Sequence, residues 1–347
     1  MKKIFLFIAI LFVFLSPNSL YAQSPDDRIE AKIVKINNTT VTVELLESAQ
    51  KGKIVPITLF DERQLQTQQF IEGDYVLVST IPGPEGDQFI LVDHVRTFPL
   101  LLLFALFLLV VIVIGKVKGI LSFIGMIFSF VIIGQFIVPQ IMLGNDPLFI
   151  SLLGSLFIIP ATFYIGHGFK WQTTIAVIST FIALLITGIL AYIFVIFAKL
   201  TGFSAEEAIF IQAIPGQQIN IQSLLLAGIV IGAMGVLDDI TISQTSIVDK
   251  LIQANPKYTF KKVFSEAMDV GRDHISSLVN TLVLVYAGAA LPLFVLFHNA
   301  QLGGYSEVIN MEIIATEIVR TLVSSIGIIS AVPITTLFAS WYIKKHS

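Results

Sequence analysis

Two adjacent carboxylates, Asp238 and Asp239, stand inside a long apolar segment of the chain. A charged side chain in the middle of a membrane-spanning helix costs at least about 2.5–3.5 kcal/mol on insertion scales. Such a group is therefore usually protonated, paired with a buried cation or reached by water. Because intramembrane acids mark ion or proton pathways, this pair is the first candidate for chemistry, as two proton-binding groups.

Helical spacing places Asp239 on a stripe of small residues along one helix face. Glycines at this spacing let a second helix approach closely, so we expect Asp239 to point into a helix–helix contact rather than toward lipid. Asp238 lies about 100° round the helix, in line with Thr241 and Thr245. The two serines at the end of the stripe are expected to line the path of the ion. In chain order the stripe is Gly228, Gly232, Gly235, Asp239, Ser243 and Ser246.

A structural alternative exists for the aspartate pair. The span could end at Leu237, which would leave both carboxylates at the cytoplasmic headgroup region as a solvated helix end. Two observations favour the functional interpretation: the hydrophobic pattern continues from Ile240 to Val248, and basic residues begin only at Lys250.

A second polar cluster, Arg272-Asp273-His274, opens the segment that we predict to be the sixth span. Arg272 or His274 could offset the charge of the aspartates, and His274 could relay protons near neutral pH. The alternative is a charged helix N-terminus, where the helix dipole favours Asp273. For Arg272 we prefer that structural role. Asn280, about one turn inside, is expected to hydrogen-bond a neighbouring helix, and all four residues are included in the proposed pathway.

The segment 201–222 mixes polar and apolar residues in a way that a simple span does not. A re-entrant segment tolerates this only where its backbone is buried in protein or lines water. Under that interpretation Gln217, Gln218 and Asn220 help to line a path. The alternative is an external loop with a short surface helix.

Composition indicates the broad class. Of 347 residues, 55% are hydrophobic and 13% are charged, about half the charged share of an ordinary soluble chain. We therefore predict a polytopic α-helical membrane protein, in contact with the lipid bilayer, with a small β domain before the first span. The seven predicted spans are 98–115, 119–141, 148–166, 172–197, 223–248, 276–297 and 321–343.

Residues 1–22 have the pattern of a signal peptide, with Lys2 and Lys3, an apolar run and a plausible cleavage point after Ala22. The alternative is an uncleaved signal anchor, and either would export the segment that follows. Residues 23–97 contain five short alternating segments separated by turns, which predicts a compact OB-like barrel. Its seven basic and twelve acidic residues disfavour nucleic acid, so we expect any partner docked there to be a protein.

Positive charge predicts the orientation. With the β domain outside, ten Lys and Arg residues of the transmembrane domain 98–347 fall on the cytoplasmic side, against only Lys199 and Arg320 outside. This predicts a seven-span protein of the bacterial cytoplasmic membrane, with an extracytoplasmic β domain and a cytoplasmic C-terminus. The ten residues are Lys116, Lys118, Lys170, Lys250, Lys257, Lys261, Lys262, Arg272, Lys344 and Lys345.

Enzyme motifs are largely missing. The chain has no cysteine, no His-Glu-x-x-His zinc spacing, no phosphate loop and no Gly-x-Ser-x-Gly elbow. We therefore expect no enzyme activity, no metal and no cofactor. An intramembrane aspartyl protease would need Asp269 as a mate for the aspartate pair, but Asp269 falls in a basic cytoplasmic segment. A net charge of −3 also disfavours a nucleic-acid partner.

Two long motifs resemble the YibE/F-like family of bacterial membrane proteins. They are Gly235-Val-Leu-Asp-Asp-Ile-Thr-Ile-Ser-Gln244 and the segment from Gly271 to Pro292. Two shorter motifs, 47–53 and 92–96, lie in the N-terminal domain, and the similarity runs from about residue 25 to the C-terminus. The resemblance implies a polytopic architecture without an established activity.

A weaker likeness concerns the helix pair 231–248 and 271–297, which is similar to the central helices of resistance–nodulation–division transporters and their Sec-accessory relatives. In those pumps a Gly-rich span with an Asp-Asp pair takes part in proton translocation, which implies proton binding at Asp238 and Asp239. The chain departs from the pattern in its small external domain and in having no clear intramembrane lysine. The leading hypothesis is a proton-coupled transporter or translocation-accessory protein, moving protons or an unknown small solute. The alternative is a non-transporting scaffold whose acidic barrel docks a partner.

Overall fold

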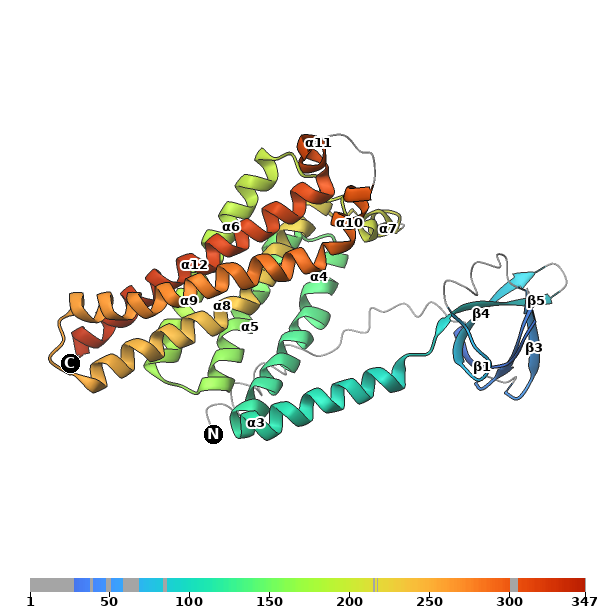
Figure 1. Ribbon diagram of the computed structural model, residues 1–347, viewed down its shortest axis with the longest axis horizontal. Coiled ribbons are helices and arrows are strands. Elements are labelled where there is room, and N and C mark those ends of the chain that lie inside the picture. Colours follow the sequence, from blue (N-terminus) through green and yellow to red (C-terminus); the bar gives the residue numbers. More distant parts are fainter. Residues whose placement is uncertain are drawn as a thin grey trace. The chain divides into compact units, whose positions relative to one another are not determined.

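The computed structural model describes residues 28–37, 40–47, 51–58, 69–83, 86–214, 216, 218–299 and 305–346. These residues form two compact units, which we describe separately: a sheet unit that ends at Lys116 and a helical unit that begins at Val117. Figure 1 labels their elements in chain order. The predicted leader, residues 1–22, lies outside the described residues.

The sheet unit contains one antiparallel sheet with the strand order β3-β2-β1-β4-β5. The strands are β1 Arg28–Asn37, β2 Thr40–Leu45, β3 Ile54–Thr58, β4 Tyr75–Gly83 and β5 Gly86–His94. Alternation along β2 buries Val41, Val43 and Leu45, which pack with Ile33 of β1 and Val78 of β4. The predicted N-terminal β domain is therefore confirmed as an antiparallel sheet.

The sheet does not show that its strands close into a barrel. The edge strands β3 and β5 approach each other, but among the described residues no ladder joins them. The sheet is therefore open, and the OB-like barrel stays a prediction.

Helix α3, Thr97–Ile132, consists of two helices that meet at Lys116. Lys116 has φ 50° and ψ −134°, which lies outside the helical region and interrupts the helix. The interruption falls between the predicted spans 98–115 and 119–141. The part of α3 before Lys116 contains no buried residue and belongs to the sheet unit, so that unit extends beyond the composition change at residue 97.

The helical unit continues from the second part of α3 into a π-helical turn, η1, the short helix α4 and eight further helices of the described chain. Their bounds are η1 Ile133–Ile137, α4 Val138–Met142, α5 Pro147–His167, α6 Trp171–Phe197, α7 Glu206–Gln212, α8 Ile221–Ala254, α9 Phe260–Ala289, α10 Leu291–Asn299, α11 Tyr305–Asn310 and α12 Glu312–His346.

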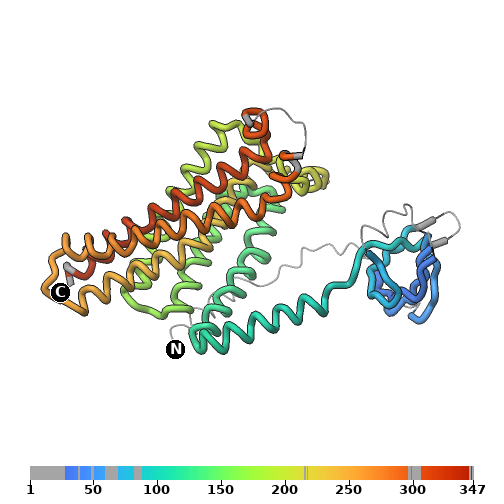
Figure 2. The backbone as a smooth tube through the Cα atoms, viewed as in Figure 1, coloured from blue at the N-terminus to red at the C-terminus, as the bar shows by residue number. Residues whose placement is uncertain are grey.

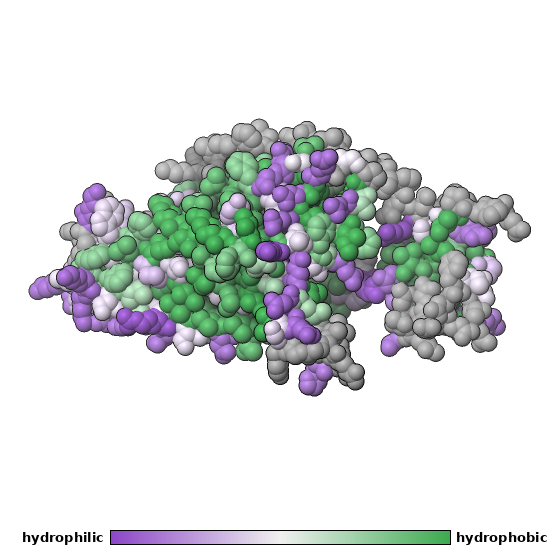
Figure 3. Space-filling view, turned by 90° about the horizontal axis from the view of Figure 1, so that it is seen from above, coloured by the Kyte–Doolittle hydropathy of each residue, from purple (hydrophilic) through white to green (hydrophobic). Residues whose placement is uncertain are grey.

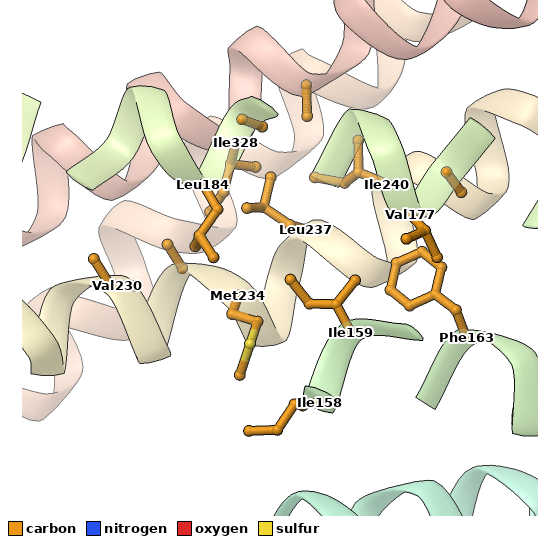
Figure 4. Packing of buried hydrophobic residues seen from close by; sticks show 14 of the residues in the cluster. Ile158, Ile159, Phe163, Val177, Leu184, Val230, Met234, Leu237, Ile240 and Ile328 are labelled. Carbon is orange, nitrogen blue, oxygen red and sulfur yellow. The ribbon is translucent and has the colours of Figure 1, made fainter. Parts of the chain in front are cut away.

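Helices α6, α8 and α12 pack against one another and form the centre of the helical unit. Helix α5 packs on α8, and α9 packs on α12 and α8. The second part of α3 lies beside α5, where a Cβ at Gly125 would be 3.5 Å from the Thr162 backbone (Figure 2). In the core, Leu237 of α8 lies beside Leu184 of α6 and Ile328 of α12 (Figure 4).

Five helices of the described chain are long and apolar enough to cross a membrane, which confirms a polytopic membrane protein. They are Thr97–Met142, Pro147–His167, Trp171–Phe197, Ile221–Ala254 and Glu312–Ile343. The difference from seven predicted spans has two causes. First, one continuous helical stretch that includes Lys116 covers the first two predicted spans. Second, the predicted span 276–297 extends past the end of α9 at Ala289.

The surface of the helical unit is strongly apolar. Figure 3 shows a broad hydrophobic field, with hydrophilic groups gathered at one end and in a band across the view. On α6 alone Leu185 is 53% exposed and Phe197 is 82% exposed. Exposed leucine and phenylalanine at this density match contact with lipid hydrocarbon rather than with water.

Candidate functional site

Helix α8 carries the aspartate pair in its middle. Asn220 caps its N-terminus by accepting a hydrogen bond from the Ser223 amide at 3.0 Å. Asp238 is half-buried, and its Oδ1 atom is fully buried without a hydrogen-bond partner among the described residues. Asp239 is exposed. The two neighbouring acids therefore have different surroundings, and only Asp238 is drawn into the packed interior.

The pair does not stand at a helix end. Helix α8 continues without interruption to Ala254. At one end of the bundle Trp171 of α6 stacks on Tyr342 of α12, with ring centroids 5.4 Å apart, and Val248 of α8 packs in the same cluster. Because a helix rises about 1.5 Å per residue, Asp239 lies roughly 14 Å along α8 from Val248. Helix α8 therefore does not end at Leu237, whereas the position of the membrane boundary relative to the pair stays a prediction.

The buried face next to Asp238 is polar. Thr241 and Thr180 of α6 share a hydrogen bond of 2.9 Å between their hydroxyl oxygens. Thr241 Oγ1 also lies 3.0 Å from the Leu237 carbonyl, which can only accept, so Thr180 is the donor to Thr241. The carboxylate of Asp238 is thus one helical turn from a hydroxyl pair that joins α6 and α8.

The glycine stripe does not make the predicted helix contact. Gly228, Gly232 and Gly235 are exposed, and among the described residues no atom lies within 4 Å of a Cβ built on any of them. The reason is that α8 packs through its other faces, on which Val230 and Leu237 are buried. Asp239, on the same stripe, therefore does not point into a helix–helix contact within the described chain.

The two serines that continue the stripe are half-buried. Ser246 Oγ donates to the Ile242 carbonyl of its own helix at 2.8 Å. This bond satisfies the hydroxyl locally. The structure neither joins Ser243 and Ser246 to a path nor excludes them from one.

The second cluster lies on α9, well inside that helix. Helix α9 begins at Phe260 and is capped by Thr259, so Arg272-Asp273-His274 is not a helix N-terminus, contrary to the structural alternative. Arg272 forms an exposed ion pair with Asp269 on the same face of α9. Its charge is thus neutralised locally rather than by the aspartates of α8.

The other residues of that cluster have no common site with the aspartate pair. Asp273 and Asn280 are exposed, and His274 is half-buried. The hydrogen bond expected from Asn280 to a neighbouring helix is not among the contacts of the described residues. Among the described residues, none of these side chains forms a hydrogen bond or ion pair with Asp238 or Asp239.

Sequence reasoning missed a basic group near Asp239. Burial and a backbone hydrogen bond with Phe163 dominate the surroundings of His167 at the end of α5, and the charges of Lys118, Lys170 and Asp239 make smaller contributions. These residues come from three different elements. The only sequence signal was the position of His167 directly after an apolar run, which by itself does not indicate its neighbour.

The polar segment before α8 makes several hydrogen bonds at helix ends. Asn220 is the cap of α8, and Gln222 donates to the Leu200 carbonyl. Ser223 Oγ donates to Asp146, the cap of α5, at 2.7 Å. Gln218 is exposed, and Gln217 lies outside the described residues. Since the Asn220 side chain is used as a cap, its predicted path-lining role is not supported.

Gln244 is a second residue whose role sequence reasoning missed. Its Nε2 atom donates to the Ala267 carbonyl of α9 at 2.8 Å and to Thr336 Oγ1 of α12 at 2.7 Å. A Cβ at Gly271 would lie 3.1 Å from the same nitrogen, so only glycine lets α9 come this close. Gln244 therefore joins three helices, and Gly271 makes room for that contact.

Among the described residues no three His, Asp or Glu side chains are grouped so that they could hold a metal ion. Together these observations define a polytopic helical membrane protein with an aspartate pair on one of the helices that are long and apolar enough to cross a membrane. The YibE/F-like protein family matches residues 103–345, and the chain therefore belongs to this family. The matched range contains both long motifs, whereas segments 47–53 and 92–96 precede it. No curated protein and no solved structure matches the chain.

Proposed function

We propose that this protein is a proton-coupled transporter or translocation-accessory protein in which Asp238 exchanges a proton. The observation that supports the proposal is the Oδ1 atom of Asp238, which is buried without a partner inside a helix suited to span a membrane. A carboxylate in that position is costly when charged, so proton binding relieves the cost. Asp239 is the neighbouring proton acceptor in this proposal.

The proposed arrangement in the membrane follows from the positive-inside bias. We propose seven spans in the cytoplasmic membrane of a bacterium, with the sheet unit as an extracytoplasmic OB-like domain and the C-terminus in the cytoplasm. Two features support this number. The interruption at Lys116 divides one long apolar stretch into two pieces of span length, and α9 with α10 supplies one more.

Purified protein in liposomes with a trapped pH-sensitive dye tests the proposal. The wild-type chain should dissipate an imposed pH gradient, and Asp238→Asn should abolish the flux while folding is retained. Asp239→Asn should reduce the flux less, because Asp239 is exposed. Asp249→Asn is the matched control: it lies on the same helix, where its carboxylate accepts a bond from Gln253 at 2.7 Å. Wild-type flux in the Asp238→Asn, Asp239→Asn double variant would refute the proposal.

A scaffold role is the second candidate. The side chains of Ile54, Ile71 and Tyr75 in the sheet unit are at least half exposed. Exposed apolar side chains of this size are a feature of protein-binding surfaces. A protein partner would cover it. In that case deletion of residues 23–97 should abolish the cellular function, whereas neutral substitutions at the aspartates should leave it intact.

A further inference from the structure

Helix α9 packs on α12 and α8 through one side, and its other side is polar and uncovered within the described chain (Figure 1). We call the four exposed residues Ser276, Ser277, Asn280 and Thr281 the α9 polar face. The Thr281 hydroxyl donates to the Ser277 carbonyl at 3.0 Å. Among the described residues no hydrogen bond reaches the side-chain amide of Asn280. Its donors and its acceptor therefore point away from the bundle without a partner.

This face lies at the level of the bundle core. On the opposite side of α9, Leu282 is buried in the cluster that contains Leu237 of α8 and Ile328 of α12. Leu278, one turn earlier, packs against the same cluster. Asn280 lies between these two leucines along the helix. Because α8 and α12 are long and apolar enough to cross a membrane, a bilayer around them also surrounds the α9 polar face.

Lipid hydrocarbon is a poor cover for this face. Hydrocarbon offers no hydrogen-bond partner, and polar side chains at membrane depth usually face protein or water. Helix α9 is 30 residues long, yet it is not among the five helices of the described chain that are apolar enough to cross a membrane. Its outer side therefore needs a polar cover.

The chemistry of the face fits a second copy of the same face. Two copies in one membrane have the same orientation, so a two-fold axis along the membrane normal brings each residue near its own counterpart. The amide of Asn280 both donates and accepts, and so does the hydroxyl of Ser277, so each can pair with its counterpart. Gly288 is exposed on the same side with nothing within 4 Å, which leaves room for a second helix.

The charged residues of α9 are compatible with such a contact. Asp273 lies two turns before Asn280, and the ion pair of Asp269 with Arg272 lies further toward the start of the helix. Two helices that cross near Asn280 at about 20–50° have moved apart at that level. The contact is therefore centred on neutral side chains, and the like charges of two copies do not oppose each other closely.

We propose that the α9 polar face binds the α9 polar face of a second copy, so that the protein forms a two-fold dimer in the membrane. Hydrogen bonds between asparagine and serine side chains across the two helices stabilise the contact. The dimer does not depend on proton exchange at Asp238, and a failure of either proposal leaves the other standing.

Disulfide crosslinking in the membranes of expressing cells tests the contact, because the natural chain has no cysteine. Oxidation should convert Ser277→Cys and Thr281→Cys into a product of twice the chain mass. Leu185→Cys on α6 is the matched control: Leu185 is 53% exposed on the apolar surface and should give no such product.

Single-molecule counting of fluorescent chains in lipid bilayers measures the strength of the dimer. Asn280→Ala should raise the dissociation constant about tenfold, because it removes one hydrogen-bonded pair. Asn280→Gln retains the amide and should keep most of the association. An unchanged dissociation constant in Asn280→Ala would contradict the proposed contact.

The crosslinking experiment also distinguishes the other covers of this face. A product of a different mass would show that another membrane protein lies on α9. Reaction of Asn280→Cys with a membrane-impermeant maleimide, without crosslinking of Ser277→Cys, would show that water covers it. Either result, or chains that stay single under oxidation, would overturn the proposed dimer.

Discussion

Asp93 and Arg96, at the end of β5, form an ion pair of 2.8 Å that holds the carboxylate in its charged form. The guanidinium of Arg96, with help from the His94 amide, lowers the pKa of Asp93 from 3.8 to about 2. A lowered folded-state pKa stabilises the fold above the unfolded value, and this contribution is lost as the pH falls through about 2. Arg96→Gln should therefore raise the pKa of Asp93 toward 3.8.

Carboxyl carbon chemical shifts of Asp93, followed by NMR during an acid titration, measure this change. Arg96→Lys is the control, because it keeps a positive charge and should leave the pKa below 3.8. The full shift is not expected in Arg96→Gln, since the His94 amide still donates at 2.8 Å. An unchanged titration in that variant would mean that the ion pair does not form.

Gly271 is the closest approach of α9 to the α8–α12 pair. A methyl group there would lie 2.6 Å from Val332 Cγ1, and a β-branched side chain cannot easily move away. Gly271→Ala should therefore destabilise the protein by about 1–3 kcal/mol. Gly288→Ala, on the same helix with nothing within 4 Å, should instead be neutral or stabilise by up to about 1 kcal/mol. Chemical unfolding in detergent compares the two, and equal effects would contradict the packing.

At the residue scale, the sequence shows which acidic residues could carry function more readily than it shows which residues surround them. The prediction of Asp238 and Asp239 as candidate groups needed only local hydropathy. The role of Gln244 could not be predicted, because its partners Ala267 and Thr336 come from two distant helices. For the same reason the neighbour of Asp239 near the end of α5 was missed.

The carboxylate of Glu312, at the start of α12, holds the loop after α6. Glu312 Oε1 accepts from the Thr201 amide at 2.7 Å, from the Gly202 amide at 3.0 Å and from the Thr201 hydroxyl. Hydrogen bonds to a charged acceptor are worth about 1.5–3 kcal/mol each when removed. Glu312→Gln should therefore loosen the loop without unfolding the helices.

Hydrogen–deuterium exchange at the two loop amides measures this loosening. Both amides should exchange faster in Glu312→Gln, because the amide side chain offers one neutral acceptor in place of a carboxylate. Glu307→Gln in the neighbouring α11 is the control, since Glu307 is exposed. Unchanged protection of Thr201 and Gly202 in Glu312→Gln would show that the backbone holds the loop without this acid.

Element ends and helix faces were harder to predict than elements. Strands and apolar helices follow from alternation and long hydrophobic runs, which are local. The stripe of Gly228, Gly232 and Gly235 correctly lies on one face, but spacing does not tell whether a partner covers that face. The apolar residues of α8 are spread around the helix, so its sequence does not separate faces that contact protein from faces that contact lipid. The predicted sixth span begins at residue 276, well after the start of α9 at Phe260, because the first half of α9 is rich in charged residues.

At the scale of the whole molecule, composition was sufficient for the class and insufficient for the number of spans. A hydropathy count depends on where a helix is interrupted, and the interruption at Lys116 is a matter of backbone conformation. The α9–α10 boundary near Ala289 divides another apolar stretch. The number of spans and the side on which each loop lies therefore need a direct measurement.

Single cysteines provide that measurement, because the natural chain contains none. Lys35 in β1, Ser306 in α11 and Lys257 before α9 are all exposed positions, so each can carry a reactive thiol. If the chain crosses seven times with its positive loops inside, a membrane-impermeant maleimide on intact cells should label Lys35→Cys and Ser306→Cys. Lys257→Cys should react only after the cells are opened. Lys345→Cys, an exposed position beyond the last span, separates seven crossings from six. With Lys35→Cys labelled on intact cells, Lys345→Cys should be protected if the chain crosses seven times and labelled if it crosses six times.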